Sequence, residues 1–230
     1  MRRRQFARWV GAAAGGGLVG LSGCAEKTEE GSISRAQTGT VTPTESMMSR
    51  RVDPEAPPVP DIDPNQAGGE LFSSVVPVEK AVYQKTNQFR NKKSLRPLML
   101  DRFLSDIARA YSCSMLDNEF RGHIDQQGRS ASDRVDKYGF PYDRVGENLV
   151  YLPEKWIAGE YGKVTANNAA DATIQMWADG EHRKNLVNDS LKSSGVGACV
   201  GEYGQGTWIY ITAMYSGRPP VVTDTNTEKK

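Results

Sequence analysis

The segment Thr207-Trp-Ile-Tyr-Ile-Thr-Ala-Met-Tyr215 decides the fold of this chain, because it is apolar at almost every position. Side chains alternate between the two faces of a β-strand. One face therefore carries Trp208, Tyr210, Thr212 and Met214, and the other carries Ile209, Ile211, Ala213 and Tyr215. A strand that is apolar on both faces has to be covered on both sides. We therefore expect this strand to lie in a sheet between two layers of helices.

The segments before this strand supply both layers. Apolar residues at helical spacing predict helices over 78–91, from Asp101 onward, over 131–138 and from about 166. Apolar runs and alternation predict strands over 147–152 and 195–201, in addition to 207–215. Helices that come before and between strands predict a three-layer αβα sandwich of the α+β class, which we place over residues 76–217.

The composition narrows the class of protein. The chain has 230 residues, of which 38% are hydrophobic and 25% charged, and its formal net charge is +1. Four arginines and no acidic residue precede Cys24, so the rest of the chain carries 25 basic and 28 acidic residues. These values exclude a multi-span membrane protein and a basic nucleic-acid binder, so we expect no nucleic-acid partner.

The first 23 residues have the pattern of an export signal. Four arginines precede a short apolar run, which ends in Leu21-Ser22-Gly23-Cys24. Arg3-Arg4-Gln5-Phe6 resembles a twin-arginine motif, and Leu-Ser-Gly-Cys resembles the bacterial lipobox. We therefore predict a lipoprotein signal peptide over 1–23, followed by lipidation of Cys24. Acylated Cys24 would anchor the exported chain in a membrane lipid layer, facing the periplasm or the exterior.

Residues 24–75 are predicted to form a disordered tether. Residues 25–75 contain six prolines, nine acidic residues and a single aromatic residue, Phe72, and they show no sustained period. A segment with so little apolar surface cannot offset the entropy of ordering its backbone. We expect it to hold the domain away from the membrane, and we expect residues 218–230 to form a flexible tail.

Several motifs of the domain occur in an order that is known from one protein family. They are Asn87-x-x-Arg90, Leu95-x-Pro97-Leu98, Gly122-His123-x-Asp125, Gly146-Glu147-Asn148-Leu149, Trp177 followed by His182-Arg183-x-Asn185, and Gly195-Val196-Gly197. Together they resemble the bacterial SCP-like domain of the CAP superfamily, which groups cysteine-rich secretory proteins, antigen 5 and pathogenesis-related proteins. The resemblance implies an αβα sandwich, in agreement with the strand pattern.

The resemblance also implies a site. Both histidines of the chain, His123 and His182, fall in these motifs, and Glu147 falls in a third. Family members place such residues in one surface groove, so we expect the three side chains to converge there. Asp125, Asn148, Glu181 and Arg183 would then lie at the periphery of the groove.

Two arrangements of these three residues are open at this point. His123, His182 and Glu147 together could bind a divalent metal such as zinc, with one coordination position left for water. Alternatively, Glu147 accepts a hydrogen bond from one ring and fixes its tautomer. No zinc-protease helix or nucleophile turn occurs in the domain, so we expect a non-enzymatic module that binds a lipid, peptide or glycan of the cell envelope. The alternative is a metal-assisted hydrolase with Glu147 as the base and His123 and His182 beside it.

Three details depart from the family pattern or stay open. Gly180 stands where the eukaryotic branch has an acidic residue, and Asp179 or Glu181 could substitute for it. The segment 152–164 is longer than usual, and it could form either a flap over the groove or a loop with buried aromatic residues. Cys113 and Cys199 could form a disulfide in an exported protein. They are far apart in the sequence, which does not show whether the fold brings them together.

Overall fold

The computed structural model describes residues 55–140, 142 and 144–220. The predicted signal peptide, the predicted lipidation site Cys24, the first part of the predicted tether and the last ten residues lie outside the described residues. Within the described part of the chain, no helix is both long and apolar enough to span a membrane.

The predicted central strand lies inside a four-stranded sheet. β4 (Thr207–Ser216) pairs antiparallel with β3 (Ser193–Glu202) on one side and with β2 (Val145–Pro153) on the other. The short β1 (Met99–Leu100) pairs parallel with β3, which gives the order β1-β3-β4-β2. Residues 209–216 of β4 are buried without a break, which confirms the expectation of burial on both faces.

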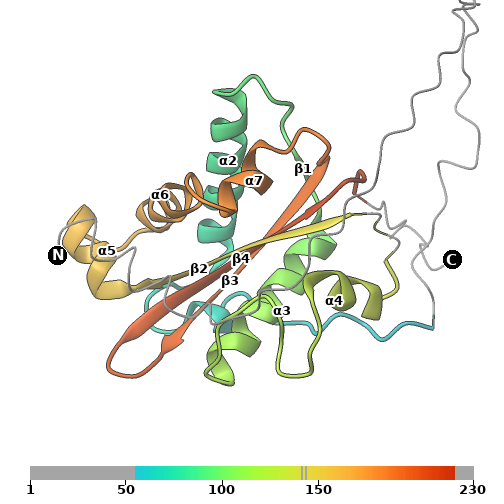
Figure 1. The fold of residues 1–230 in the computed structure, drawn as a ribbon. Helices are drawn as coiled ribbons and strands as arrows, with labels where there is room; N and C mark the ends of the chain where they lie inside the picture. Colours follow the sequence, from blue (N-terminus) through green and yellow to red (C-terminus); the bar gives the residue numbers. More distant parts are fainter. Residues whose placement is uncertain (1–54, 141, 143, 221–230) are drawn as a thin grey trace, which may run out of the picture. The chain divides into compact units, whose positions relative to one another are not determined.

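Helices cover both faces of the sheet, as the sequence predicted. Figure 1 shows α2 (Val76–Asn91), α6 (Ala166–Trp177) and α7 (His182–Val187) on one side, and α3 (Arg102–Asp117) and α4 (Ala131–Lys137) on the other. The α+β class and the αβα sandwich are therefore confirmed. Four elements were not predicted: the short 3-10 helix η2 (Gln66–Gly68), the two-residue strand β1, α5 (Glu154–Tyr161) and α7.

Local signals set several helix starts. Asp101 is the N-cap of α3, where its side chain accepts hydrogen bonds from the backbone N–H groups of Phe103 and Leu104. Ser130 and Asp133 form a reciprocal capping box at the start of α4. Such caps satisfy N–H groups that have no partner inside the helix, so the sequence alone fixes these boundaries well.

Two glycines let α3 pack directly onto β3. A Cβ atom at Gly195 would lie 2.2 Å from the backbone nitrogen of Ser105, and a Cβ at Gly197 would lie 1.9 Å from that of Arg109. No side chain fits in either place, which explains the Gly-Val-Gly motif of this strand. The same approach brings the Cα atoms of Cys113 and Cys199 to 5.0 Å, and the two residues form a disulfide. The structure thus decides a pairing that the sequence left open.

The predicted boundary between tether and domain is wrong. The domain does not begin at residue 76, because Ala67 and Val75 are buried in the core and Ile62, Leu71 and Phe72 pack against it. The spacing of these apolar side chains follows neither a helical nor a strand period. Each one packs against the surface formed by other segments of the domain. The segment 152–164 is neither a flap nor a plain loop, since α5 packs its buried Ile157 against the core.

We expect Gly197→Ala to lower the free energy of unfolding by about 1–3 kcal/mol or more, because the added methyl group must push α3 away from β3. Gly206→Ala is the matched control, because no heavy atom lies within 4 Å of the place that its new methyl group would take. Urea denaturation of both variants measures the difference. Equal stability of the two variants would contradict the close contact.

Candidate functional site

A buried carboxylate organises the predicted site. Glu147 lies near the start of β2 with its side chain only 3% exposed, and its Oε1 is 2.9 Å from Nδ1 of His123. Its Oε2 forms an ion pair with Nη2 of the equally buried Arg134 on α4. Since a carboxylate only accepts hydrogen bonds, His123 donates from Nδ1, which leaves Nε2 as the acceptor nitrogen of the neutral ring. The His123 side chain is 55% exposed, so this nitrogen can meet a ligand.

Arg134 links Glu147 to the loop that carries His123. Its Nη1 donates to the backbone oxygens of His123 (3.2 Å) and Arg129 (2.9 Å). Its guanidinium carbon lies 3.4 Å from the ring centroid of Tyr111, whose hydroxyl donates to the oxygen of Gly122 at 2.6 Å. Burial raises the pKa of Tyr111, which keeps this hydroxyl a hydrogen-bond donor.

Asp125 shapes the far end of the same loop. Its Oδ1 accepts hydrogen bonds from the backbone N–H groups of Gln127 and Arg129, and its Oδ2 accepts one from Nε of Arg129 at 2.8 Å. Burial acts to raise the pKa of Asp125, but these hydrogen bonds outweigh it and hold the pKa below its usual range. Asp125 therefore stabilises the turn after His123, and its carboxylate is already occupied.

Arg121 fixes the near end of the loop, two residues before His123. Its guanidinium carbon lies 4.2 Å from the ring centroid of Trp208 and 4.4 Å from that of Tyr203, and its Nε donates to the Tyr210 hydroxyl at 2.9 Å. Cation–π contacts of this kind stabilise a charge that several aromatic rings surround. The loop of His123 is thus held at both ends by arginines.

Two asparagines bring His182 to the same place. Asn185 of α7 donates from Nδ2 to the backbone oxygen of Glu147 (3.1 Å) and to Oδ1 of Asn148 (2.8 Å), and Asn148 donates to the backbone oxygen of His182 (3.0 Å). Gly146 allows this approach, since a Cβ there would lie 2.9 Å from Oδ1 of Asn185. α7 is therefore bonded to β2 directly beside Glu147.

The buried Arg90 holds the other end of α7. This residue of α2 has no exposed surface, and its Nη1 donates to the backbone oxygens of Leu186 (3.0 Å) and Asn188 (2.9 Å). These are carbonyl groups at the end of a helix, which lack partners inside it. Arg90 thereby fixes the short helix that begins with His182, which explains the arginine of the Asn87-x-x-Arg90 motif.

The surroundings of His182, His123 among them, act on its ring. Burial lowers the pKa of His182, and the positive charge that His123 can carry lowers it further, whereas Glu181 acts in the opposite direction. His182 is therefore held toward its neutral form, in which a ring nitrogen can accept a proton or bind a metal. Lys184 pairs with Glu181 at 2.6 Å, and the Glu181 side chain is 84% exposed.

The structure changes the roles of several predicted residues. His123, Glu147 and His182 come together, as expected, but a groove around them stays a prediction. Asn148 is fully buried, so it clamps α7 and does not lie at a periphery. Arg183 is exposed, and Asp179 accepts a hydrogen bond from the N–H of Gly180. Sequence reasoning gave no role to Arg134 or Asn185; for Asn185, its place in the His182-Arg183-x-Asn185 motif was the available signal.

The predicted three-ligand metal set does not form. Both oxygens of Glu147 are engaged, one by His123 and one by Arg134. Among residues 55–140, 142 and 144–220, no group of three or more His, Cys, Asp or Glu side chains is placed to hold a metal ion. The residues fit the other arrangement, in which Glu147 orients one ring and only the two imidazoles could be protein ligands.

A comparison with protein families decides the class. The family model described as "CAP: Cysteine-rich secretory protein family" matches residues 83–215, which is more than half of the chain. This chain belongs to the CAP family. The matched range includes both histidines and Glu147, as well as all four strands except the last residue of β4.

Two bacterial proteins are similar in sequence to this CAP domain. The uncharacterized protein YkwD of Bacillus subtilis (strain 168) is 32% identical over 126 residues, which are 54% of this chain and 44% of YkwD. The uncharacterized membrane protein YlbC of the same organism is 28% identical over 120 residues, 52% of this chain and 31% of YlbC. This chain therefore matches less than half the length of either relative.

Solved structures with a similar fold include an extracellular SCP-domain protein from Bacillus anthracis str. Ames and an outer surface protein from Borrelia burgdorferi. The first has 23% identity and a TM-score of 0.47, and the match covers 60% of this chain and 40% of that one. The second has 18% identity and a TM-score of 0.47, and the match covers 62% of this chain and 95% of that one.

Replacing Arg134 by Met should lower the free energy of unfolding by about 3–5 kcal/mol, because it leaves the Glu147 carboxylate buried without its cation. The matched control is Arg129→Met, which removes a partner from Asp125 in a pair whose arginine is 36% exposed, and which should cost about 1 kcal/mol or less. Chemical denaturation measures both. A double variant with Glu147→Gln should recover part of the loss; no recovery would argue against the Arg134–Glu147 pair as the cause.

Proposed function

We propose that this CAP domain is an exported, membrane-anchored binding module whose ligand meets the exposed ring of His123 beside His182. The observation that supports it is the buried Glu147, which holds the His123 ring by Nδ1 while the His123 side chain is 55% exposed. The hydrogen bond to Glu147 already fixes the orientation of the ring, so ligand binding costs little further side-chain entropy. The arrangement therefore favours recognition of a partner.

The two imidazoles suggest the kind of ligand. Neutral imidazole nitrogens bind divalent metals such as zinc, and protonated imidazoles bind acidic groups. A bound metal would supply an electron-pair acceptor for an oxygen or nitrogen atom of the ligand. His123 and His182 would hold this metal, and Glu147 would fix the His123 tautomer. Among envelope peptides, glycans and lipids, the site thus favours molecules with an acidic or metal-binding group.

The hydrolase alternative receives less support. A general base must be able to reach the proton that it removes. Glu147 is almost fully buried, and both of its oxygens already accept hydrogen bonds from His123 and Arg134. A carboxylate in this state orients and neutralises its neighbours. This is why we assign the site to binding.

Zinc titration into the full chain, followed by isothermal calorimetry, tests the site. We expect zinc to bind, His123→Ala and His182→Ala each to abolish measurable binding, and Glu147→Gln to weaken it by about 10–100-fold. Gln126→Ala, an exposed neighbour in the same loop, is the control and should bind as the parent does. Equal binding by all variants would rule out zinc at this site. If zinc fails, binding of an acidic envelope component that depends on the same histidines would still support the module.

Anchoring is tested separately in cells that receive a radiolabelled fatty acid. The export pattern before Cys24 and the apolar run preceding it support an acyl anchor at this residue. We expect the parent chain to carry the label and to sediment with membranes, and Cys24→Ser to lose both properties. Cys199→Ser, which removes another cysteine, should keep the label. A labelled Cys24→Ser chain would contradict the anchor.

A further inference from the structure

Buried hydrogen-bond donors without acceptors gather between α2 and the sheet. Thr86 and Arg90 lie one turn apart on α2, and therefore on the same face of the helix, and they are 1% and 0% exposed. Oγ1 of Thr86 and Nη2 of Arg90 have no hydrogen-bond partner among the described residues. An unpaired polar group in a protein interior costs free energy, so two of them on one helix face indicate a partner from outside the chain.

The sheet adds a third donor to this cluster. Tyr215 of β4 has no exposed surface and packs in the same core cluster as Val78 of α2, whereas the neighbouring Met214 packs in the other cluster. The Tyr215 oxygen accepts a hydrogen bond from Nδ2 of Asn148 at 3.5 Å, and no described residue accepts its proton. Burial raises the pKa of Tyr215, so the hydroxyl keeps this proton and stays a donor.

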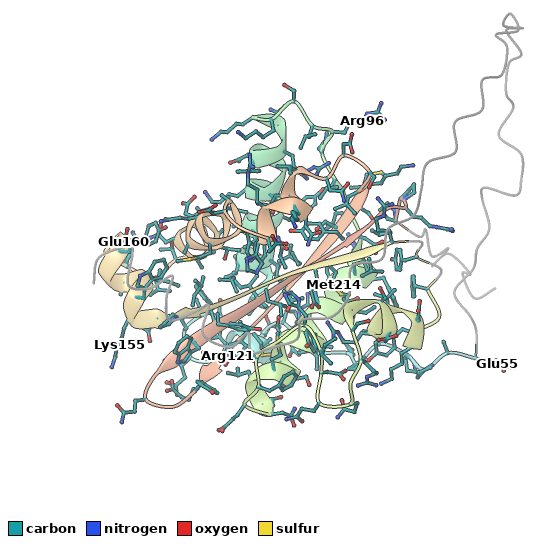
Figure 2. All side chains as sticks on the ribbon, viewed as in Figure 1. Glu55, Arg96, Arg121, Lys155, Glu160 and Met214 are labelled. Carbon is teal, nitrogen blue, oxygen red and sulfur yellow. A yellow bond between two sulfur atoms is a disulfide. The ribbon has the colours of Figure 1, made fainter. Side chains whose placement is uncertain are left out.

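Arg90 also carries a charge that no described carboxylate pairs with. Its Nε donates to the backbone oxygen of Arg96 at 2.9 Å, and Figure 2 shows Arg96 on the segment that joins α2 to β1. Its Nη1 donates to the backbone oxygens of Leu186 and Asn188, which are also uncharged. Burial lowers the pKa of Arg90 even though Asp189 acts in the opposite direction. A guanidinium keeps its proton in proteins, so an unpaired positive charge lies in the interior.

These features limit the ligand to a small anion. The three donors are enclosed in the core, so nothing large can enter among them. A water molecule would accept their hydrogen bonds, but it brings two protons that need acceptors and leaves the charge of Arg90 unpaired. The side-chain oxygen of Asn148 does not serve such a water, since it already accepts from Asn185 at 2.8 Å.

We propose that Thr86, Arg90 and Tyr215 bind one chloride ion between α2 and β4. The ion accepts hydrogen bonds from the two hydroxyls and from Nη2 of Arg90, and its charge neutralises that of the guanidinium. Because Arg90 holds the end of α7, the ion also stabilises the helix that begins with His182. This site is separate from the ring nitrogens of the candidate site and from the apolar pocket at the β1 edge of the sheet.

Thermal unfolding of the full chain carrying Cys24→Ser, which lacks the predicted acylation site, tests the proposal in sodium chloride and in sodium gluconate. At equal concentration the two salts give the same ionic strength, but gluconate is too large for a buried site. We expect the midpoint of unfolding to be higher in chloride by about 2–4 °C, because a ligand that binds only the folded state stabilises it. Bromide resembles chloride in size and charge and should give a similar increase.

Substitutions of threonine locate the effect. Thr86→Val removes one donor and keeps the shape of the side chain, so it should abolish most of the chloride-dependent increase. Thr86→Ser keeps the hydroxyl and should retain the increase. Thr173→Val is the matched control, because Thr173 is also a buried helical threonine, but its hydroxyl already donates to the backbone oxygen of Ala169 at 2.8 Å. This control should lower the midpoint equally in both salts and keep the chloride-dependent increase.

Anomalous diffraction from crystals of the same chain grown in sodium bromide locates the ion directly. The expected anomalous peak lies within hydrogen-bonding distance of Nη2 of Arg90 and of the hydroxyls of Thr86 and Tyr215. Ordinary water density at this place, without an anomalous peak, would overturn the proposal.

This site can be tested independently of the proposed zinc site. A variant with both His123→Ala and His182→Ala should keep the anomalous peak and the chloride-dependent increase, so failure of the zinc experiment leaves this prediction untouched. Loss of the peak in that variant would contradict the chloride site. Equal midpoints in chloride and gluconate would do so as well, and so would a loss of the increase in Thr173→Val as large as that in Thr86→Val.

Discussion

The fold depends on the burial of β4 on both of its faces. Ile209 and Ile211 on one face and Tyr210 and Met214 on the other are all fully buried, which is possible only if helices cover the sheet on each side. In β3, Gly195 and Gly197 let α3 pack directly on the strand. This brings Cys113 close enough to Cys199 to form a disulfide. The layers, the close helix contact and the covalent link thus follow from one constraint.

The candidate site depends in turn on one buried charge. Glu147 starts from the strand next to β4, so its carboxylate lies where water is excluded and requires partners. Arg134 forms an ion pair with this carboxylate, and His123 donates a hydrogen bond to its other oxygen. The loop between His123 and Arg134 is fixed as a result. The same need makes Glu147 a poor candidate for catalysis or for metal binding, because its oxygens are already used.

Much of the architecture could be predicted from local patterns. The two-faced apolar strand, the helical stripes of α2 and α3 and the cap at Asp101 each depend on neighbours in the sequence. The extent of the domain was underestimated, because Ala67 and Val75 follow no period and gain their burial only from surface that other segments build. The helix α5 was missed because the segment around Ile157 is short and could equally have been a loop.

For the site, the sequence by itself determined the participants: two histidines and a glutamate in motifs that recur in the CAP family. It did not determine which atoms face one another. Arg134 is 13 residues from Glu147, Asn185 is 37 from Asn148, and the cysteines of the disulfide are 86 apart. Only tertiary packing sets such contacts, because each is fixed by how a helix lies on the sheet and not by any local preference of the chain. The tertiary structure therefore decided that Glu147 orients the ring of His123, and that an apolar pocket lies at the sheet edge.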